Sequence, residues 1–218
     1  MKLEGLKMNF LGDSITEGVG ASSIDKVYWK RFEKDGAIVC GNGIGGTRIA
    51  RQHTPSCEER WDRYFASRIE ELDPEADVVV VFGGTNDYGH GDAPLGRMED
   101  RNPDTFYGAL HDLYSRLMKK YPAARIIPMT PLHRTEENKY INEIGVRNVG
   151  SLGDYVAIIR EVAEYYALPL LDLYALSSMQ PELPYNNEKF YVDGLHPSDE
   201  GYERIYNLLK AHILSLPQ

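Results

Sequence analysis

The sequence predicts an α/β fold in which five parallel strands lie between two layers of helices, a three-layer αβα architecture. Two observations carry this prediction. Short apolar runs alternate along the chain with longer segments whose apolar residues recur at helical spacing. One run, residues 76–82 (ADVVVVF), contains four consecutive valines, which is typical of a parallel strand buried on both faces. Strands that alternate with helices in this way form a parallel sheet through right-handed crossovers.

The strands and helices can be placed in order along the chain. Ser56 and Glu59 have the spacing of a capping box, Asn102-Pro103 is a helix-start signal, and Ser198 precedes the last helix as an N-cap. The five predicted strands are residues 8–11, 37–40, 76–82, 125–129 and 168–173. The predicted helices carry apolar stripes that we assign to the core: Trp61, Phe65 and Leu72; Phe106, Leu110, Leu113 and Leu117; Val156, Ile159, Val162 and Tyr166; and Tyr202, Ile205, Leu209 and Ile213.

Composition excludes several classes of protein. The 218 residues fit one domain, residues 1–218, and the net charge of −9 argues against a nucleic-acid or anionic-membrane surface. No apolar run approaches the roughly 20 residues of a membrane helix, and the first residues lack the features of a signal peptide, which predicts a cytoplasmic protein. Cys40 and Cys57 form no disulfide framework, and the six histidines are scattered. We therefore expect no metal site and no cofactor, and the sequence gives no indication of the oligomeric state.

The first stretch that can carry chemistry is MNFLGDSITEG, residues 8–18. Gly12 and the polar residues after it mark a sharp exit from the first strand. Ser14 is therefore expected just past the carboxyl end of that strand, where ligands bind in open α/β sheets. Taken alone, Ser14 also fits a helix cap.

The second stretch, CGNGIGGT at residues 40–47, contains a formal GxGxxG at Gly41, Gly43 and Gly46. The context is wrong for a dinucleotide site, because the motif follows the second strand and no acidic residue follows at the ribose position. A loop whose glycines bring backbone N–H groups close to a ligand is the better interpretation.

Two later stretches supply the side chains that Ser14 needs. Asn86, in FGGTNDYG after the valine strand, is either a turn residue or an amide donor to an oxyanion. Asp193 and His196, in VDGLHPSDEGY, lie three residues apart. At that spacing the carboxylate can orient the imidazole and leave its other nitrogen to face a serine. The four stretches together supply the groups needed for acyl transfer.

These four stretches resemble the marks of the SGNH (GDSL-like) hydrolase superfamily: Gly12-Asp13-Ser14, Gly46 within GIGGT, Gly84-Thr85-Asn86-Asp87, and Asp193-Gly194-Leu195-His196-Pro197. They occur in the family's order and span nearly the whole chain, with Ile15 replacing the leucine of GDSL. The resemblance implies a nucleophile at Ser14, a base at His196 and an orienting carboxylate at Asp193. It also implies an oxyanion hole made by the backbone N–H of Ser14, the backbone N–H of Gly46 and the side chain of Asn86. Gly45 is the alternative to Gly46.

The resulting hypothesis is a serine esterase that acts through an acyl-enzyme on a small-molecule ester. The alternative is a non-catalytic small-molecule or sugar-binding module on the same flavodoxin-like sheet. The chain contains no GxSxG motif, which excludes the nucleophile elbow of α/β-hydrolases. His90 and His133 are the reserve candidates for the base.

Two long loops, about residues 87–101 and 131–150, are expected at the same sheet edge. Both are polar, which favours a short acyl group, most simply acetyl, on a polar alcohol. The resemblance adds carbohydrate acetylesterases as candidates, with Tyr88 and Tyr140 as residues that can stack on a sugar ring. The candidate substrate contacts are Asp13, Arg48, Tyr88, His90 and His133.

Overall fold

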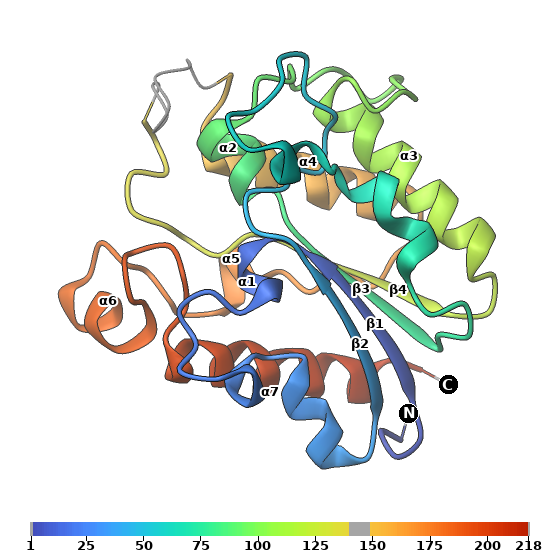
Figure 1. Ribbon diagram of the computed structural model, residues 1–218, viewed down its shortest axis with the longest axis vertical. Coiled ribbons are helices and arrows are strands. Elements are labelled where there is room, and N and C mark those ends of the chain that lie inside the picture. The colour runs from blue at the N-terminus through green and yellow to red at the C-terminus, as the bar shows by residue number, and fades with distance from the viewer. Residues whose placement is uncertain (1, 140–148, 218) are drawn as a thin grey trace.

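The computed structural model describes residues 2–139 and 149–217. A parallel sheet lies between two layers of helices, as Figure 1 shows. The order of strands across the sheet is β2-β1-β3-β4. Their bounds are Lys7–Gly12 for β1, Ile38–Gly43 for β2, Val78–Phe82 for β3 and Arg125–Met129 for β4. The predicted α/β class and the parallel sheet are confirmed.

The two middle strands are buried on both faces. In the register of β1 and β3, Phe10 lies beside Val80 and Leu11 beside Val81. Val79 and Val81 pack on one face, and the alternate valines pack on the other. All four valines of β3 are at most 2% exposed. The run of valines therefore marks a buried parallel strand, as predicted.

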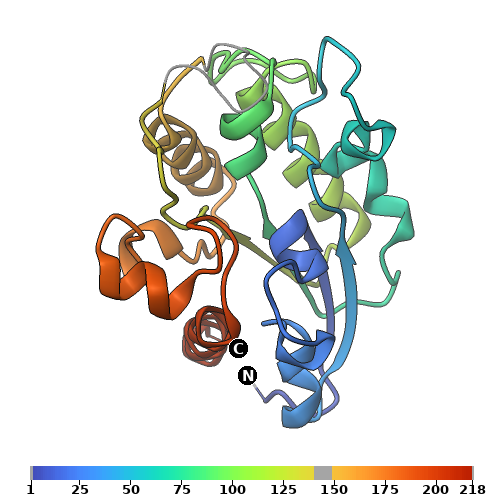
Figure 2. The same ribbon diagram turned by 60° about the vertical axis from the view of Figure 1, so that its left-hand side comes forward.

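The helices divide between the two faces of the sheet (Figures 1 and 2). Side chains of α3 and α4 join the apolar core on one face, and those of α7 join the core on the other. The bounds of the α-helices are Ser14–Glu17 (α1), Thr85–His90 (α2), Phe106–Lys120 (α3), Leu152–Tyr165 (α4), Leu173–Leu176 (α5), Pro184–Phe190 (α6) and Asp199–Ser215 (α7). Short 3₁₀ helices span Ile24–Lys26, Lys30–Asp35, Glu59–Asp62 and Phe65–Glu71.

The predicted fifth strand, residues 168–173, is wrong: within the described parts of the chain the sheet has four strands. Leu171 forms an isolated parallel bridge with Met129. Two features keep the pairing this short. Pro169 has no N–H to donate, and Asp172 caps helix α5, which begins at the next residue.

The predicted helix starts are borne out unevenly. Ser198 caps α7, and its side chain accepts a hydrogen bond from the backbone of Gly201. The segment after Ser56 instead forms two 3₁₀ helices, and the Ser56 side chain donates to Asp62 and accepts from Arg48. Helix α3 begins at Phe106 with Thr105 as its cap. Asn102, three residues earlier, accepts from the backbone of Asp104 in a local turn.

No helix among the described residues is both long enough and apolar enough to cross a membrane.

Candidate active site

Ser14 is the first residue of α1, directly beyond the end of β1. Asp13 makes the turn between them, because its Oδ1 accepts the backbone N–H of Ile15 at 3.0 Å. Gly12 is required at this turn, since a Cβ there would lie 2.9 Å from the carbonyl oxygen of Phe82 and closer still to the side chain of Thr16. Ser14 is thus held at the carboxyl edge of the sheet, as the sequence predicts.

A hydrogen-bonded chain of three side chains includes Ser14. The Oγ atom of Ser14 lies 2.9 Å from Nε2 of His196. The other ring nitrogen of His196, Nδ1, lies 2.7 Å from Oδ2 of Asp193. The structure thus brings together residues that are 182 positions apart in the sequence.

Asp193 is held as a carboxylate by its neighbours. Its Oδ1 accepts the backbone N–H groups of Leu195 at 3.0 Å and His196 at 2.7 Å. Partial burial alone would raise the pKa of Asp193, but the bonds from the side chain and backbone of His196 hold it below its usual range. An ionised Asp193 favours the tautomer of His196 that carries its proton on Nδ1, which leaves Nε2 free to accept from Ser14.

The glycine loop, which we define as residues 43–50, runs beside Ser14. Gly45 is close to the nucleophile, but its N–H donates to Oε2 of Glu17 at 2.7 Å. Gly46 has a positive φ of 77°, and a Cβ there would lie 2.2 Å from the ring of Trp61. Asn86, at the start of α2, donates through Nδ2 to the carbonyl of Thr47 at 3.0 Å. Because the Gly45 N–H already has a partner, the geometry favours Gly46 over Gly45 as an oxyanion donor.

Three charged side chains hold the glycine loop in place, a role that no sequence pattern predicted for any of them. Glu17 holds Gly45 and also pairs with Arg60 at 2.7 Å. Arg68 donates to the carbonyl of Gly12 at 3.0 Å and to Oγ1 of Thr47 at 3.1 Å. The carboxylate of Asp87 accepts the N–H groups of Ile49 and Ala50, each at 2.9 Å. The side chain of Arg68 has 0% exposure, and only tertiary contacts reveal its role.

Burial shifts three titratable groups near the site. It raises the pKa of Asp13 to about 6, although the bond from Ile15 opposes the shift. It raises the pKa of Asp87 to about 6, against the bonds from Ala50 and Ile49. Burial together with the nearby charge of Arg48 lowers the pKa of His90 to about 4. His90 is therefore neutral at neutral pH.

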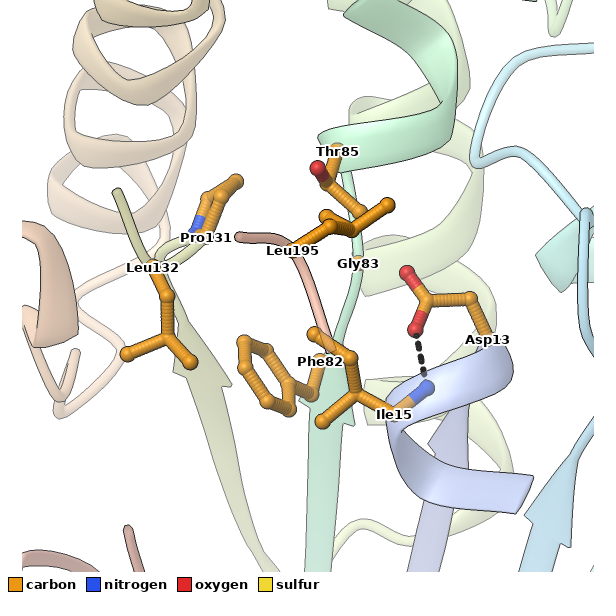
Figure 3. Close-up of a pocket in the computed structure, with 8 residues that line it drawn as sticks. All are labelled: Asp13, Ile15, Phe82, Gly83, Thr85, Pro131, Leu132 and Leu195. Atoms are coloured by element: carbon orange, nitrogen blue, oxygen red, sulfur yellow. Dashed lines mark hydrogen bonds between the residues drawn. The ribbon is translucent and has the colours of Figure 1, made fainter. Parts of the chain in front are cut away.

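The expected substrate contacts fall into different places. Asp13 is buried beside the site and lines a small pocket with Ile15, Phe82, Gly83, Thr85, Pro131, Leu132 and Leu195 (Figure 3). Arg48 and His90 line a separate cavity. His133 stacks on Tyr174 at 3.7 Å, and its Nδ1 bonds Glu137 at 2.9 Å. The imidazole that the structure shows bonded to Ser14 is that of His196, not that of the reserve candidate His133.

The expectation that Tyr88 stacks on a sugar is contradicted. Its side chain is 3% exposed, so it has no free face. Helix α2 turns the ring into the core, edge-on to Tyr155. Its hydroxyl donates to the carbonyl of Glu136 and accepts from the backbone of Lys139. Tyr140, the other predicted platform, lies outside the described residues.

Among the residues that the structure describes, no group of three or more His, Cys, Asp or Glu side chains is placed to hold a metal ion.

Comparison with known proteins identifies the family of the chain. The family model of the GDSL-like lipase/acylhydrolase family matches residues 10–204. An acetylxylan esterase of Xylanibacter ruminicola is 24% identical over 97% of this chain, which spans 44% of that relative's length.

Two solved structures share the fold. A protein from Lactobacillus plantarum is 29% identical, with 99% of each chain covered and a TM-score of 0.82. An acetyl xylan esterase is 23% identical, with 95% of this chain and 100% of that chain covered and a TM-score of 0.64. Because the family model covers most of the sequence, including all four motifs, the chain belongs to the GDSL-like lipase/acylhydrolase family.

Proposed function

We propose that this protein is a serine esterase that hydrolyses short-acyl esters, most simply acetyl esters, of a polar or carbohydrate alcohol. The observation that carries the proposal is the hydrogen-bonded chain from Ser14 through His196 to Asp193. A serine, an oriented imidazole and a carboxylate in this order form the machinery of nucleophilic acyl transfer.

In the first half of the reaction, Oγ of Ser14 attacks the ester carbonyl carbon and its proton passes to Nε2 of His196. The carbonyl oxygen becomes an oxyanion, which accepts hydrogen bonds from the backbone N–H groups of Ser14 and Gly46 and from Nδ2 of Asn86. The bond from carbon to the alcohol oxygen then breaks, and His196 returns the proton to the leaving alcohol. The product of this half is an acyl group bonded to Ser14.

In the second half, water attacks the acyl carbon and gives a proton to His196. The bond to Ser14 breaks, Oγ regains the proton, and the carboxylic acid leaves. Asp193 stays ionised throughout and stabilises the imidazolium that forms twice per cycle.

Two observations support a short acyl group on a polar alcohol. The small pocket lined by Asp13, Ile15 and Leu195, the sequence neighbours of Ser14 and His196, offers little open space for a long chain. Two of the similar proteins are named as acetylxylan esterases.

A fluorophosphonate probe and a series of nitrophenyl esters test the proposal. The probe should label Ser14, and Ser14→Ala should fold normally, lose the label and lose hydrolysis by several orders of magnitude. The rate should be highest for acetyl and fall with chain length, and acetate should be released from acetylated xylo-oligosaccharides. Labelling that persists in Ser14→Ala, or a rate that peaks at long chains, would contradict the proposal. Absence of any hydrolysis would favour the non-catalytic binding module.

A further inference from the structure

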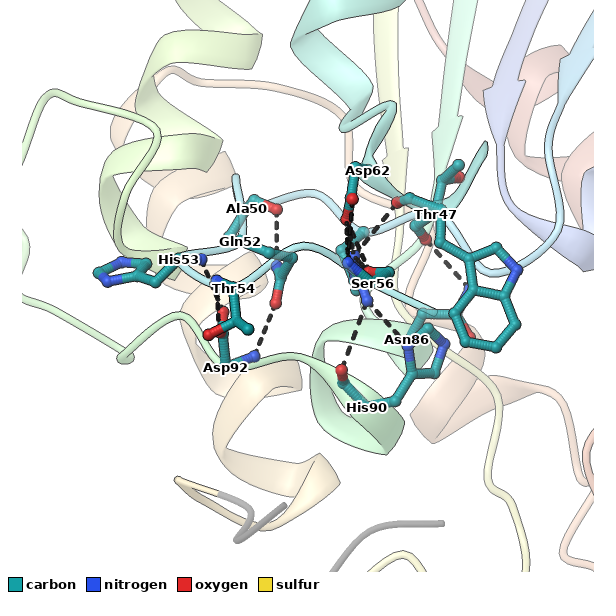
Figure 4. Close-up of polar contacts among 12 residues, drawn as sticks. Thr47, Ala50, Gln52, His53, Thr54, Ser56, Asp62, Asn86, His90 and Asp92 are labelled. Carbon is teal, nitrogen blue, oxygen red and sulfur yellow. Dashed lines mark hydrogen bonds and ion pairs between the residues drawn. The ribbon is translucent and has the colours of Figure 1, made fainter. Parts of the chain in front are cut away.

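A cavity of about 210 Å³ opens beside the glycine loop. Arg48, Trp61, His90 and Asp92 line it, together with a short loop that includes Cys57. Figure 4 shows the polar contacts around it, in which Gln52, His53 and Thr54 bond Asp92, just beyond helix α2. None of the steps proposed above uses this cavity.

The cavity adjoins the proposed oxyanion hole. The ring of Trp61 lies against Gly46, where even a Cβ would clash. Asn86 and His90 are four residues apart on α2, so they share one face of that helix with about 5–6 Å between their Cβ atoms. A group bonded to the ester at Ser14 therefore needs to extend only a short way to enter the cavity.

The charged groups that line the cavity already have hydrogen-bond partners. Arg48 is 2% exposed and donates to Asp62 at 2.9 Å. The carboxylate of Asp92 accepts the backbone N–H groups of His53 and Thr54, each at 2.8 Å. An ionic ligand would have to compete with these bonds, so the lining suits a neutral molecule.

His90 supplies a directed donor to this lining. Its Nδ1 lies 2.9 Å from Nη1 of Arg48, which can only donate. Nε2 of the neutral ring then carries the proton and can donate to a hydroxyl oxygen. The ring of Trp61, 4.7 Å from that of His90, adds an aromatic surface. An aromatic surface beside an N–H donor is suited to a polyhydroxylated ring, which has both C–H faces and hydroxyl groups.

We propose that this cavity binds the alcohol half of the substrate, a neutral sugar ring, with Trp61 as its stacking surface and His90 as a hydroxyl-binding residue. The inference rests on the proposed acetyl esterase function, because an acetyl group of three heavy atoms would leave such a cavity empty. The residue proposed to stack on the sugar ring is now Trp61 instead of Tyr88, which is buried.

Cys57 provides a test that does not need catalysis. Its side chain is a free, exposed thiol in the cavity lining, whereas the other free cysteine, Cys40, lies on β2 and serves as an internal reference. In Ser14→Ala, xylo-oligosaccharide at about four times its Kd should slow alkylation of Cys57 by iodoacetamide about fivefold. Alkylation of Cys40 should keep its rate.

Two variants extend the test to turnover. Trp61→Ala should raise KM for acetylated xylo-oligosaccharide about tenfold, the size of one lost aromatic contact, with a smaller change in kcat. If Trp61→Ala fails to fold, Cys57→Phe takes its place as the test. This substitution narrows the cavity from its exposed side and should also raise KM for acetylated xylo-oligosaccharide. If Trp61 only supports Gly46, Trp61→Ala would instead lower kcat on sugar esters and simple esters alike, which would overturn the proposal.

Two further outcomes would overturn it. The first is sugar binding, measured by calorimetry, that leaves Cys57 unprotected. The second is protection of Cys57 by methyl butyrate but not by sugar, which would make the cavity an acyl pocket. Protection by sugar in a protein that hydrolyses no acetyl ester would support the subsite and contradict the esterase function, so the two proposals can fail separately.

Discussion

Ser14 lies between two loops that are built in different ways. The base loop, residues 192–197, is held mainly by bonds within itself: Asp193 bonds the ring and the backbone of His196 three residues away, and Val192 N–H donates to the carbonyl of His196 at 2.9 Å. From outside the loop, the backbone N–H of Thr135 donates to the carbonyl of Gly194. The glycine loop is held by Glu17, Arg68 and Asp87, all distant from it in the sequence. Local spacing therefore specifies the base loop, whereas the tertiary fold specifies the glycine loop.

The two loops also differ in exposure. The Asp193 side chain is 50% exposed, so water can partly replace the hydrogen bonds it makes. Arg68 and Asp87 are buried, and a partner lost there leaves a polar group without water. Substitutions in the base loop should therefore affect activity more than stability, while those beneath the glycine loop should affect both.

The largest effect is expected in the base loop. His196→Ala should lower kcat by about 10⁴–10⁶, because members of a triad act as a unit. The fall in kcat should be about tenfold to a hundredfold smaller in Asp193→Ala than in His196→Ala, because the exposed site of Asp193 admits water as a substitute partner for Nδ1 of His196. Activity on nitrophenyl acetate measures both, with urea unfolding as the control for stability. Equal activity in His196→Ala and the wild type would assign the base to another residue.

The second-largest effect is expected when Arg68 is substituted. Arg68→Met keeps an apolar side chain but removes the guanidinium, which lies over the ring of Phe65 and donates to the carbonyls of Gly12 and Asn42 and to Thr47. Buried acceptors without a partner cost about 1–3 kcal/mol each. We expect the free energy of unfolding to fall by about 2–4 kcal/mol and kcat to fall with it.

Arg68→Lys is the matched control for this change, since one ammonium can satisfy some of the same acceptors. It should lie between the wild type and Arg68→Met in both measurements. An Arg68→Met protein as stable as the wild type would show that the guanidinium costs as much in desolvation as its bonds return.

These expectations explain which parts of the molecule the sequence could predict. The valine strand and the Ser198 cap depend on local pattern, and the structure has both. The predicted strand at 168–173 shares that apolar pattern, but Pro169 and the start of α5 prevent its pairing. The apolar run there is typical of a strand, but Pro169 lacks the N–H that strand pairing requires.

The residues of the site also divide into those that local sequence spacing predicts and those that it does not. Asp193 and His196 could be paired from their spacing, whereas Arg68 lies within a segment predicted as an ordinary amphipathic helix. Nothing in its neighbourhood indicates that the side chain reaches Gly12, 56 residues away. Tyr88 was assigned to the site for its position in the sequence, yet the rotation of α2 buries it.

A substitution at Asn86, which bonds the glycine loop, tests how much the proposed oxyanion hole contributes to kcat. Asn86→Ala should lower kcat by about 10²–10³ with little change in KM, as loss of one oxyanion donor does. Nδ2 of Asn86 also donates to the carbonyl of Thr47. Asn86→Asp is the matched control, because aspartate has a similar size and cannot donate when ionised. A rise in KM at unchanged kcat would make Asn86 a substrate-binding residue.

The smallest effect, and one that depends on pH, is expected at Asp13, between the two loops. Its pKa is raised to about 6 chiefly by burial, while the charges of His196 on one side and Arg68 on the other oppose the shift. A carboxyl group with a raised pKa in the folded state binds its proton more tightly there than in the unfolded chain. Its contribution to stability is therefore present at low pH and is lost as the pH rises from about 4 to about 6.

Asp13→Asn removes this charge and keeps the helix cap, because asparagine and aspartate cap equally well. Relative to the wild type, the variant should gain up to about 3 kcal/mol in the free energy of unfolding between pH 4 and pH 6.5, since one pKa unit corresponds to about 1.4 kcal/mol. Urea unfolding of both proteins across that range measures the difference, in which the similar shift of Asp87 cancels. A difference that stays constant with pH would show that Asp13 remains ionised in the folded protein, held so by His196 and Arg68, and that the two loops act on it more strongly than burial does.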